Sequence, residues 1–146
     1  MKHFGIAIII LMVTALAGCG SSSTNSINGN WSATLTSADG TQALAFTATL
    51  AESGSSLTVT NLSFSTSSSC FALGTTATGA FTATGTSGGV TTGTFQLTIQ
   101  SGTGNTNGTN QLTLQGTLTN NAITGNWTLT GTGAGCTGSG TFTMTD

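Results

Sequence analysis

The chain has 146 residues and almost no charge: 3% of its residues are charged, Lys2 and His3 are its only basic side chains, and Tyr is absent. Nucleic-acid binding depends on Lys and Arg at the phosphates, and acid–base catalysis usually draws on His, Lys, Tyr or paired carboxylates, so we expect neither a nucleic-acid partner nor an enzyme. The acidic residues, Asp39, Glu52 and Asp146, lie near turn glycines or at the terminus, and we expect them to be solvated and to hold no metal or cofactor.

The N-terminus has the layout of an export signal. A basic start at Lys2 is followed by an uncharged apolar run over residues 4–17, which is shorter than the about 20 residues that a membrane-spanning helix needs. The run ends in Leu16-Ala17-Gly18-Cys19, which resembles the lipobox of bacterial lipoproteins. That resemblance implies that residues 1–18 are removed and that Cys19 carries the lipid. The alternative is an ordinary signal peptide followed by a coincidental cysteine.

Residues 19–28 are mostly Ser, Gly, Asn and Thr without periodicity, which predicts a flexible tether. The residue after Cys19 is Gly20 rather than Asp, and this resembles the sorting pattern for the outer membrane. We therefore expect a protein of the bacterial cell envelope that its lipid anchors to the outer membrane. Residues 29–146 are enough for a single domain with a modest hydrophobic core.

Residues 29–146 alternate apolar and polar side chains, with interruptions at Gly, Asn, Asp and Ser and without Pro. This period of two predicts β-strands that are buried on one face. In chain order, the expected apolar faces are Trp31, Ala33 and Leu35; Leu44, Phe46, Ala48 and Leu50; Leu57, Val59, Leu62 and Phe64; Phe81 and Ala83; Phe95, Leu97 and Ile99; Leu112, Leu114, Gly116 and Leu118; Ile123, Gly125, Trp127 and Leu129; and Cys136, Gly138, Gly140, Phe142 and Met144. A change of phase in the third strand predicts a bulge near Asn61. Asn120-Asn121 predicts a two-residue hairpin, because Asn tolerates the left-handed conformation.

The predicted fold is therefore all-β: an antiparallel up-and-down meander of about eight strands that forms a closed or nearly closed barrel. A β-sandwich is the alternative. Closure is favoured because it removes exposed strand edges, which this chain has few charged residues to protect.

Two cysteines, Cys70 and Cys136, remain after the predicted anchor. An even number of cysteines in an exported chain predicts a disulfide. A metal site is the rival interpretation, but two thiols without His or clustered carboxylates provide too few ligands.

The opposite face of the strands is rich in Thr, for example at Thr47, Thr49, Thr128 and Thr130. We interpret it as the uncharged solvent face of a sheet that is buried on one side. One alternative is an ice-binding array, which calls for flat stacked coils rather than twisted hairpins. Another is a small outer-membrane barrel whose apolar face points toward lipid.

The pattern Ile-x-Gly-Asn-Trp occurs twice, at residues 27–31 and 123–127. It resembles the Gly-x-Trp opening of the calycin superfamily, the lipocalins and avidins, which implies an antiparallel barrel that holds a small ligand in its mouth. The chain lacks the Arg that lipocalins pack over the first Trp and the Tyr of avidin ligand sites, so the resemblance extends to the barrel and not to those ligands. The candidate ligand-binding residues are Trp31, Trp127, Asn30 and Asn126. Alternatively, both Trp residues are core anchors beside closely packed glycines.

These expectations favour a non-enzymatic envelope or cell-surface module that binds a small apolar or neutral ligand, such as a glycan or a lipid. The alternative is a structural or surface-interaction protein with a filled core and no ligand pocket. A cavity of a few hundred Å³ would favour the first function, and a solid interior would favour the second.

Overall fold

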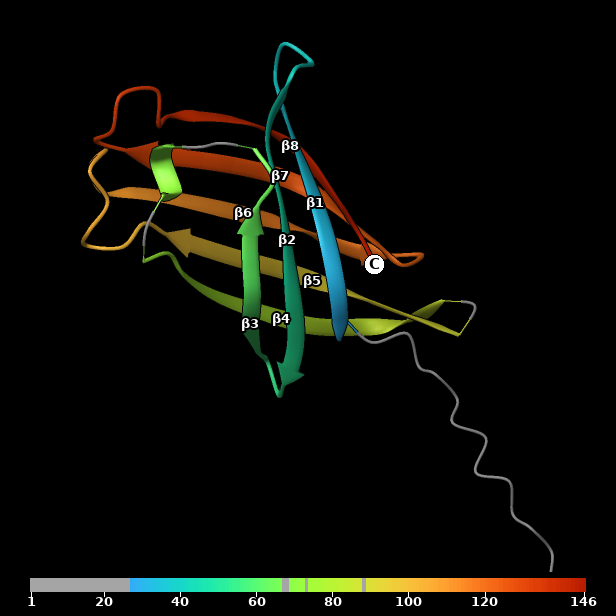
Figure 1. Ribbon diagram of the computed structural model, residues 1–146. Coiled ribbons are helices and arrows are strands. Elements are labelled where there is room, and N and C mark those ends of the chain that lie inside the picture. The colour runs from blue at the N-terminus through green and yellow to red at the C-terminus, as the bar shows by residue number, and fades with distance from the viewer. Residues whose placement is uncertain (1–26, 67–68, 73, 88) are drawn as a thin grey trace, which may run out of the picture.

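Eight antiparallel strands follow one another along the chain, and each pairs with its neighbours in sequence (Figure 1). They are β1 (Gly29–Ser37), β2 (Gln42–Ser53), β3 (Ser56–Phe64), β4 (Thr76–Ser87), β5 (Val90–Gln100), β6 (Asn110–Thr119), β7 (Ala122–Gly131) and β8 (Gly138–Thr145), with a 3-10 turn, η1 (Ser69–Phe71), between β3 and β4. β8 returns to pair with β1, so the sheet closes into a barrel. The predicted up-and-down barrel is confirmed, and the fold is not a sandwich.

The computed structural model describes residues 27–66, 69–72, 74–87 and 89–146. Cys19 and the predicted tether up to residue 26 lie outside this part of the chain. Among the described residues, none of the helical segments has the length and apolar character needed to cross a membrane.

The alternating pattern places the apolar side chains inside the barrel and the Thr residues outside. Phe46, Leu114 and Met144 are each 1% exposed or less, whereas Thr128 and Thr143 on the outer face are exposed. This is the reverse of the arrangement in an outer-membrane barrel, whose apolar side chains face lipid. The strands thus enclose a filled hydrophobic core.

Inward-facing glycines make room for the aromatic rings of the core. A Cβ atom at Gly93 would overlap the ring of Phe81, and one at Gly116 would lie 3.0 Å from Cζ of Phe142. The ring of Phe142 packs against Phe95, with 6.3 Å between the ring centroids. Small and large residues therefore alternate across the interior, as close packing of a narrow barrel requires.

Two local features confirm the predictions made at asparagines. Asn120 and Asn121 have φ angles of 51° and 62° and form the two-residue turn between β6 and β7. Asn61 has a φ of 52°, and the register between β2 and β3 shifts opposite it, between Thr47 and Thr49. The bulge changes which face of β3 points inward, which explains the change of phase in the sequence.

Two residues that were predicted on the inward faces of strands are placed differently in the structure. Ala83 is exposed, because the end of the β4–β5 hairpin extends beyond the barrel and both faces of residues 82–86 are open to solvent. Cys136 is buried, as predicted, but it precedes β8 and belongs to the loop after β7. Neither change alters the order of the strands.

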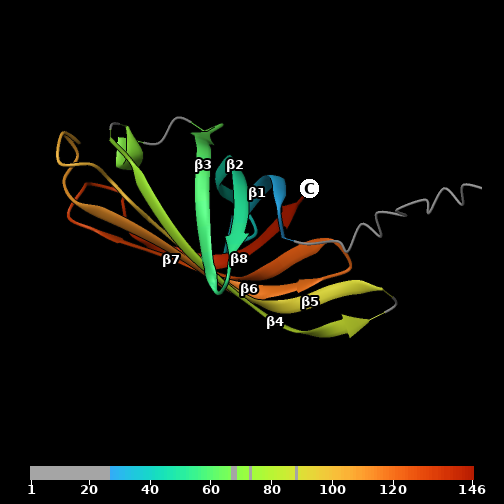
Figure 2. The same ribbon diagram turned by 90° about the horizontal axis from the view of Figure 1, so that it is seen from below.

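The barrel is narrow at one end and wide at the other. β3 pairs with β4 only at Ser56–Ala80 and Leu57–Gly79, and beyond Leu57 the two strands diverge. Figure 2 shows the result: β2 and β3 stand at a steep angle to the ribbon of β4–β7. η1 lies at the wide end, which we call the mouth.

Candidate functional site

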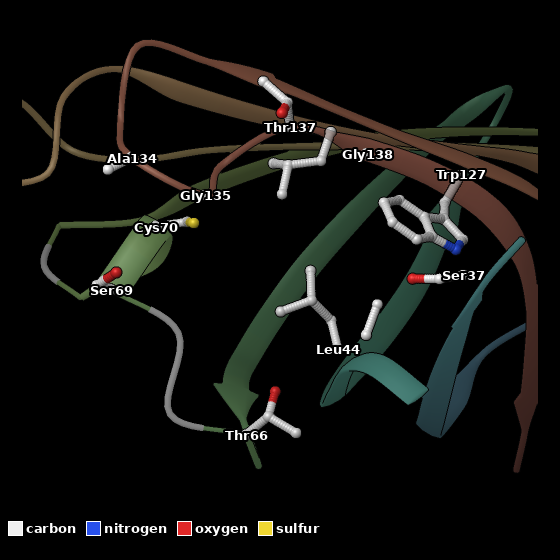
Figure 3. Close-up of a pocket in the computed structure, with 12 residues that line it drawn as sticks. Ser37, Leu44, Thr66, Ser69, Cys70, Trp127, Ala134, Gly135, Thr137 and Gly138 are labelled. Carbon is white, nitrogen blue, oxygen red and sulfur yellow. The ribbon is translucent and has the colours of Figure 1, made fainter. Parts of the chain in front are cut away.

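A cavity of about 370 Å³ lies at the mouth, between β2, the loop that contains η1 and the loop between β7 and β8 (Figure 3). We call it the mouth cavity. Its apolar side chains include Leu44, Leu129 and Trp127, and the hydroxyl groups around it are those of Ser37, Thr66, Ser69 and Thr137. All of its lining residues are uncharged. It can therefore offer apolar contact and neutral hydrogen bonds, but no ionic contact.

One wall of the mouth cavity is held by the predicted disulfide, which the structure confirms. Cys70 in η1 is bonded to Cys136, with 5.7 Å between their Cα atoms. The bridge joins two loops that are 66 residues apart in the chain. Figure 3 shows Cys70 and Ser69 on the side of the cavity that is remote from Trp127.

Asn110 is a polar residue of the mouth that is only 1% exposed. Its Nδ2 group donates to the carbonyl oxygens of Cys70 and Asn107, at 3.0 and 2.9 Å, and its Oδ1 atom accepts from the Gly133 N–H at 3.2 Å. Asn110 thus joins three loops through their backbone groups. No pattern in the sequence predicted this role.

Asn107 adds to the same network. Its amide donates to Ser69 Oγ at 3.0 Å and accepts from the Ala134 N–H at 3.2 Å. The available signal in the sequence was the close spacing of Asn105, Asn107 and Asn110 in a glycine-containing loop, because Asn side chains bond readily to backbone groups in turns.

Trp127 lies between the core and the mouth cavity. Its indole N–H donates to the carbonyl oxygen of Thr36 at 3.0 Å, and the side chain is 3% exposed. Gly138 leaves space for the ring, since a Cβ atom there would lie 3.1 Å from Cη2 of the indole. Trp127 is therefore a core anchor with one edge at the cavity.

Trp31 occupies a different environment at the narrow end. Its indole N–H donates to the carbonyl oxygen of Ile27 at 2.8 Å, and both residues are buried in the core. Packing thus begins at Ile27, two residues before the predicted start of the domain at Gly29. The structure gives Trp31 the surroundings of a core residue.

The two candidate asparagines point to the outer face, because adjacent residues of a strand face opposite ways. Asn30 is engaged: its Oδ1 atom accepts a hydrogen bond from Thr49 Oγ1 at 2.7 Å. Asn126 lies opposite Thr141 of β8 and borders an outer hollow together with Trp127. Of the four candidates, the structure therefore brings only Trp127 to the mouth cavity.

The acidic residues do not converge. Asp39 lies in the exposed β1–β2 turn, where the Thr41 hydroxyl and backbone N–H donate to its carboxylate at 2.7 and 2.9 Å and hold its pKa below the ordinary value. Asp146 lies beside Gly29 at the narrow end. The described residues contain no group of three or more His, Cys, Asp or Glu side chains that could hold a metal ion.

No protein-family model, curated protein or solved structure matches this chain. The mouth cavity is a small, uncharged hollow with an apolar floor and a hydroxyl rim.

Proposed function

We propose that this chain is a lipid-anchored, non-enzymatic module of the bacterial cell envelope that binds a small neutral ligand in the mouth cavity. The observation that carries the proposal is the uncharged lining of a hollow of about 370 Å³, a size within the range of small-molecule sites. Leu44, Leu129 and the edge of Trp127 suit a carbon skeleton, and the surrounding hydroxyls suit polar groups on the ligand. A neutral sugar unit of a glycan combines these two properties.

The proposed anchor and the mouth lie at opposite ends of the barrel. The chain enters the barrel at Ile27 and Gly29, and β1 then runs the length of the barrel to Ser37, which lines the mouth cavity. A tether from Cys19 would therefore meet the barrel at the end opposite the mouth. Because the tether joins the barrel at the other end, it leaves the mouth cavity open to ligands from solution.

The calycin resemblance supports the same proposal. An eight-stranded up-and-down barrel is the architecture that the Gly-x-Trp pattern implies, and we infer a calycin-like module whose site is reduced to the mouth. The reduction follows from the filled centre of the barrel, where Phe46 and Leu114 are buried.

The filled centre is also the observation that favours the second candidate function, a structural or surface-interaction protein without a ligand. In that case the mouth cavity would be a packing imperfection between loops. A direct binding experiment separates the two functions.

The experiment is a titration of the intrinsic Trp fluorescence with neutral mono- and disaccharides and with a monoacylglycerol. We expect a saturable change, because Trp127 borders the cavity, and we expect Thr137→Phe, which fills the cavity, to weaken the affinity about tenfold or more. Thr58→Phe, on the exposed face of β3, is the matched control and should bind like the wild type. Absence of a saturable change with every ligand would favour the structural function.

A further inference from the structure

A second hollow, of about 570 Å³, lies on the outer wall of the barrel, where β7 and β8 meet the turn between β1 and β2. We call it the outer groove. It is bordered by Thr36, Asn126, Trp127, Thr128, Ser139 and Thr141, among others. Beside it, Gly140 packs tightly against β1 and the core, because a Cβ atom there would overlap the carbonyl oxygen of Thr36 and lie 2.9 Å from the Trp127 indole nitrogen.

The outer groove continues into a line of polar side chains that crosses the sheet. The strand registers place five residues directly opposite one another on consecutive strands from β5 to β8 and on to β1: Gln96, Gln115, Asn126, Thr141 and Thr36. We call this line the polar row. Neighbouring strands are about 4.8 Å apart, so amide and hydroxyl groups repeat at short, regular intervals across five strands.

The polar row has unused hydrogen-bonding capacity. Gln96, Gln115, Asn126 and Thr141 are exposed, and within the described part of the chain the amide of Asn126 has no hydrogen-bond partner. Asn30 in the other Gly-Asn-Trp stretch differs, since Thr49 occupies its Oδ1 atom. Two identical local sequences thus present one engaged amide and one open amide.

The surroundings of the polar row restrict the kind of partner that it can bind. β1 and β5–β8 contain no charged residue, so the row lacks the cations that an anionic polymer needs. β5–β8 each pair with a strand on both sides, so their backbone groups cannot accept an added peptide strand. A partner must therefore bind through neutral side-chain hydrogen bonds along an extended line.

We propose that the outer groove and the polar row form a binding site for a neutral polysaccharide chain on the outside of the barrel. A polysaccharide presents hydroxyl groups at regular intervals, and amides both donate to and accept from such groups. This site is distinct from the mouth cavity, because the two linings have only Ser37 and Trp127 in common.

The test measures depletion of the full chain, purified from membranes in a neutral detergent, by microcrystalline cellulose, chitin and curdlan, with an alginate gel as the anionic counter-probe. We expect saturable binding to at least one neutral polymer, no binding to alginate and little change at about 0.5 M NaCl, because screening acts on charges. Binding to none of the three neutral polymers, or binding that salt abolishes, would overturn the proposal.

Variants then locate the site. The double variant Asn126→Ala, Thr141→Val removes hydrogen-bonding groups from two exposed positions and should weaken binding about tenfold or more. Thr58→Val, at another exposed position on β3, should bind like the wild type, and thermal melting should show all variants folded. Equal loss with Thr58→Val would refute a localised site. Loss with the cavity-filling Thr137→Phe alone would assign the polymer to the mouth cavity instead.

Discussion

Replacement of Asn110 tests whether the mouth is held together by one buried amide. In the Asn110→Ala variant, the Asn107 carbonyl loses a donor and the Gly133 N–H loses its acceptor, whereas the Cys70 carbonyl loses one donor and keeps the Asn105 amide. Each neutral hydrogen bond contributes about 1 kcal/mol, and leaving a buried partner unsatisfied costs about 1–3 kcal/mol. We expect the free energy of unfolding to fall by about 2–4 kcal/mol.

The Asn110→Asp variant adds a dependence on pH. A carboxylate at this position still accepts from the Gly133 N–H, but it points its second oxygen at two carbonyl oxygens. Burial and this repulsion raise the pKa of the introduced carboxyl above its unfolded value. The neutral acid is therefore the better tolerated form, so the variant should be most stable below about pH 4 and should lose stability as pH rises toward its folded pKa.

Urea unfolding, followed by Trp fluorescence at about pH 4 and pH 7, measures both effects. Gln115→Glu introduces the same change of amide to acid at an exposed position of β6 and serves as the matched control, with little change expected at either pH. A loss of less than about 0.5 kcal/mol in Asn110→Ala, or equal stability of Asn110→Asp at both pH values, would show that the buried amide does not hold the mouth together.

Four further predictions concern other parts of the molecule. Removing the disulfide with Cys70→Ala and Cys136→Ala should lower the free energy of unfolding in urea by about 4 kcal/mol, because the bridge constrains the unfolded chain by joining two cysteines that are 66 residues apart; a loss under about 1 kcal/mol would contradict this. Gly93→Ala should cost about 1–3 kcal/mol in the same assay, since its Cβ atom would overlap the Phe81 ring, and an unchanged midpoint would show that the ring can move. Cys19→Ser should leave the protein unprocessed or release it from the membrane fraction, and normal membrane retention on an immunoblot would refute lipidation. The melting temperature should stay nearly constant between about pH 5 and 9, because the described domain has no His and the lowered pKa of Asp39 makes its small stabilisation fade only as pH falls below about 4; a transition near neutral pH would contradict this account.

Local patterns in the sequence predicted the strands and turns. Trp31, Ala33 and Leu35 alternate with polar residues, and the face of a strand residue depends only on this period. Asn120-Asn121 predicted its own turn, since the left-handed conformation is a property of those two residues. The disulfide was predictable because only two cysteines follow Cys19.

The candidate site could be predicted only in part. Of the four candidates, Trp127 alone borders the mouth cavity, which also takes residues from β2 and from two loops that are distant in the chain. The role of Asn110 was not predicted, because its partners, Cys70 and Gly133, are 40 and 23 residues away in the chain. Such contacts leave no periodic signal in the sequence.

The sequence by itself determined the period of the strands, the turns at asparagines and the inward side of each strand, because these depend on residues that are neighbours in the chain. The tertiary structure decided how the two copies of Gly-Asn-Trp differ. Asn30 meets Thr49 of β2, whereas Asn126 meets Thr141 of β8 and keeps its amide open. It also decided which end of the barrel is the mouth, since the short pairing of β3 with β4 opens that end. Both outcomes depend on which strands become neighbours when the barrel closes. That choice is made by contacts between residues far apart in the chain.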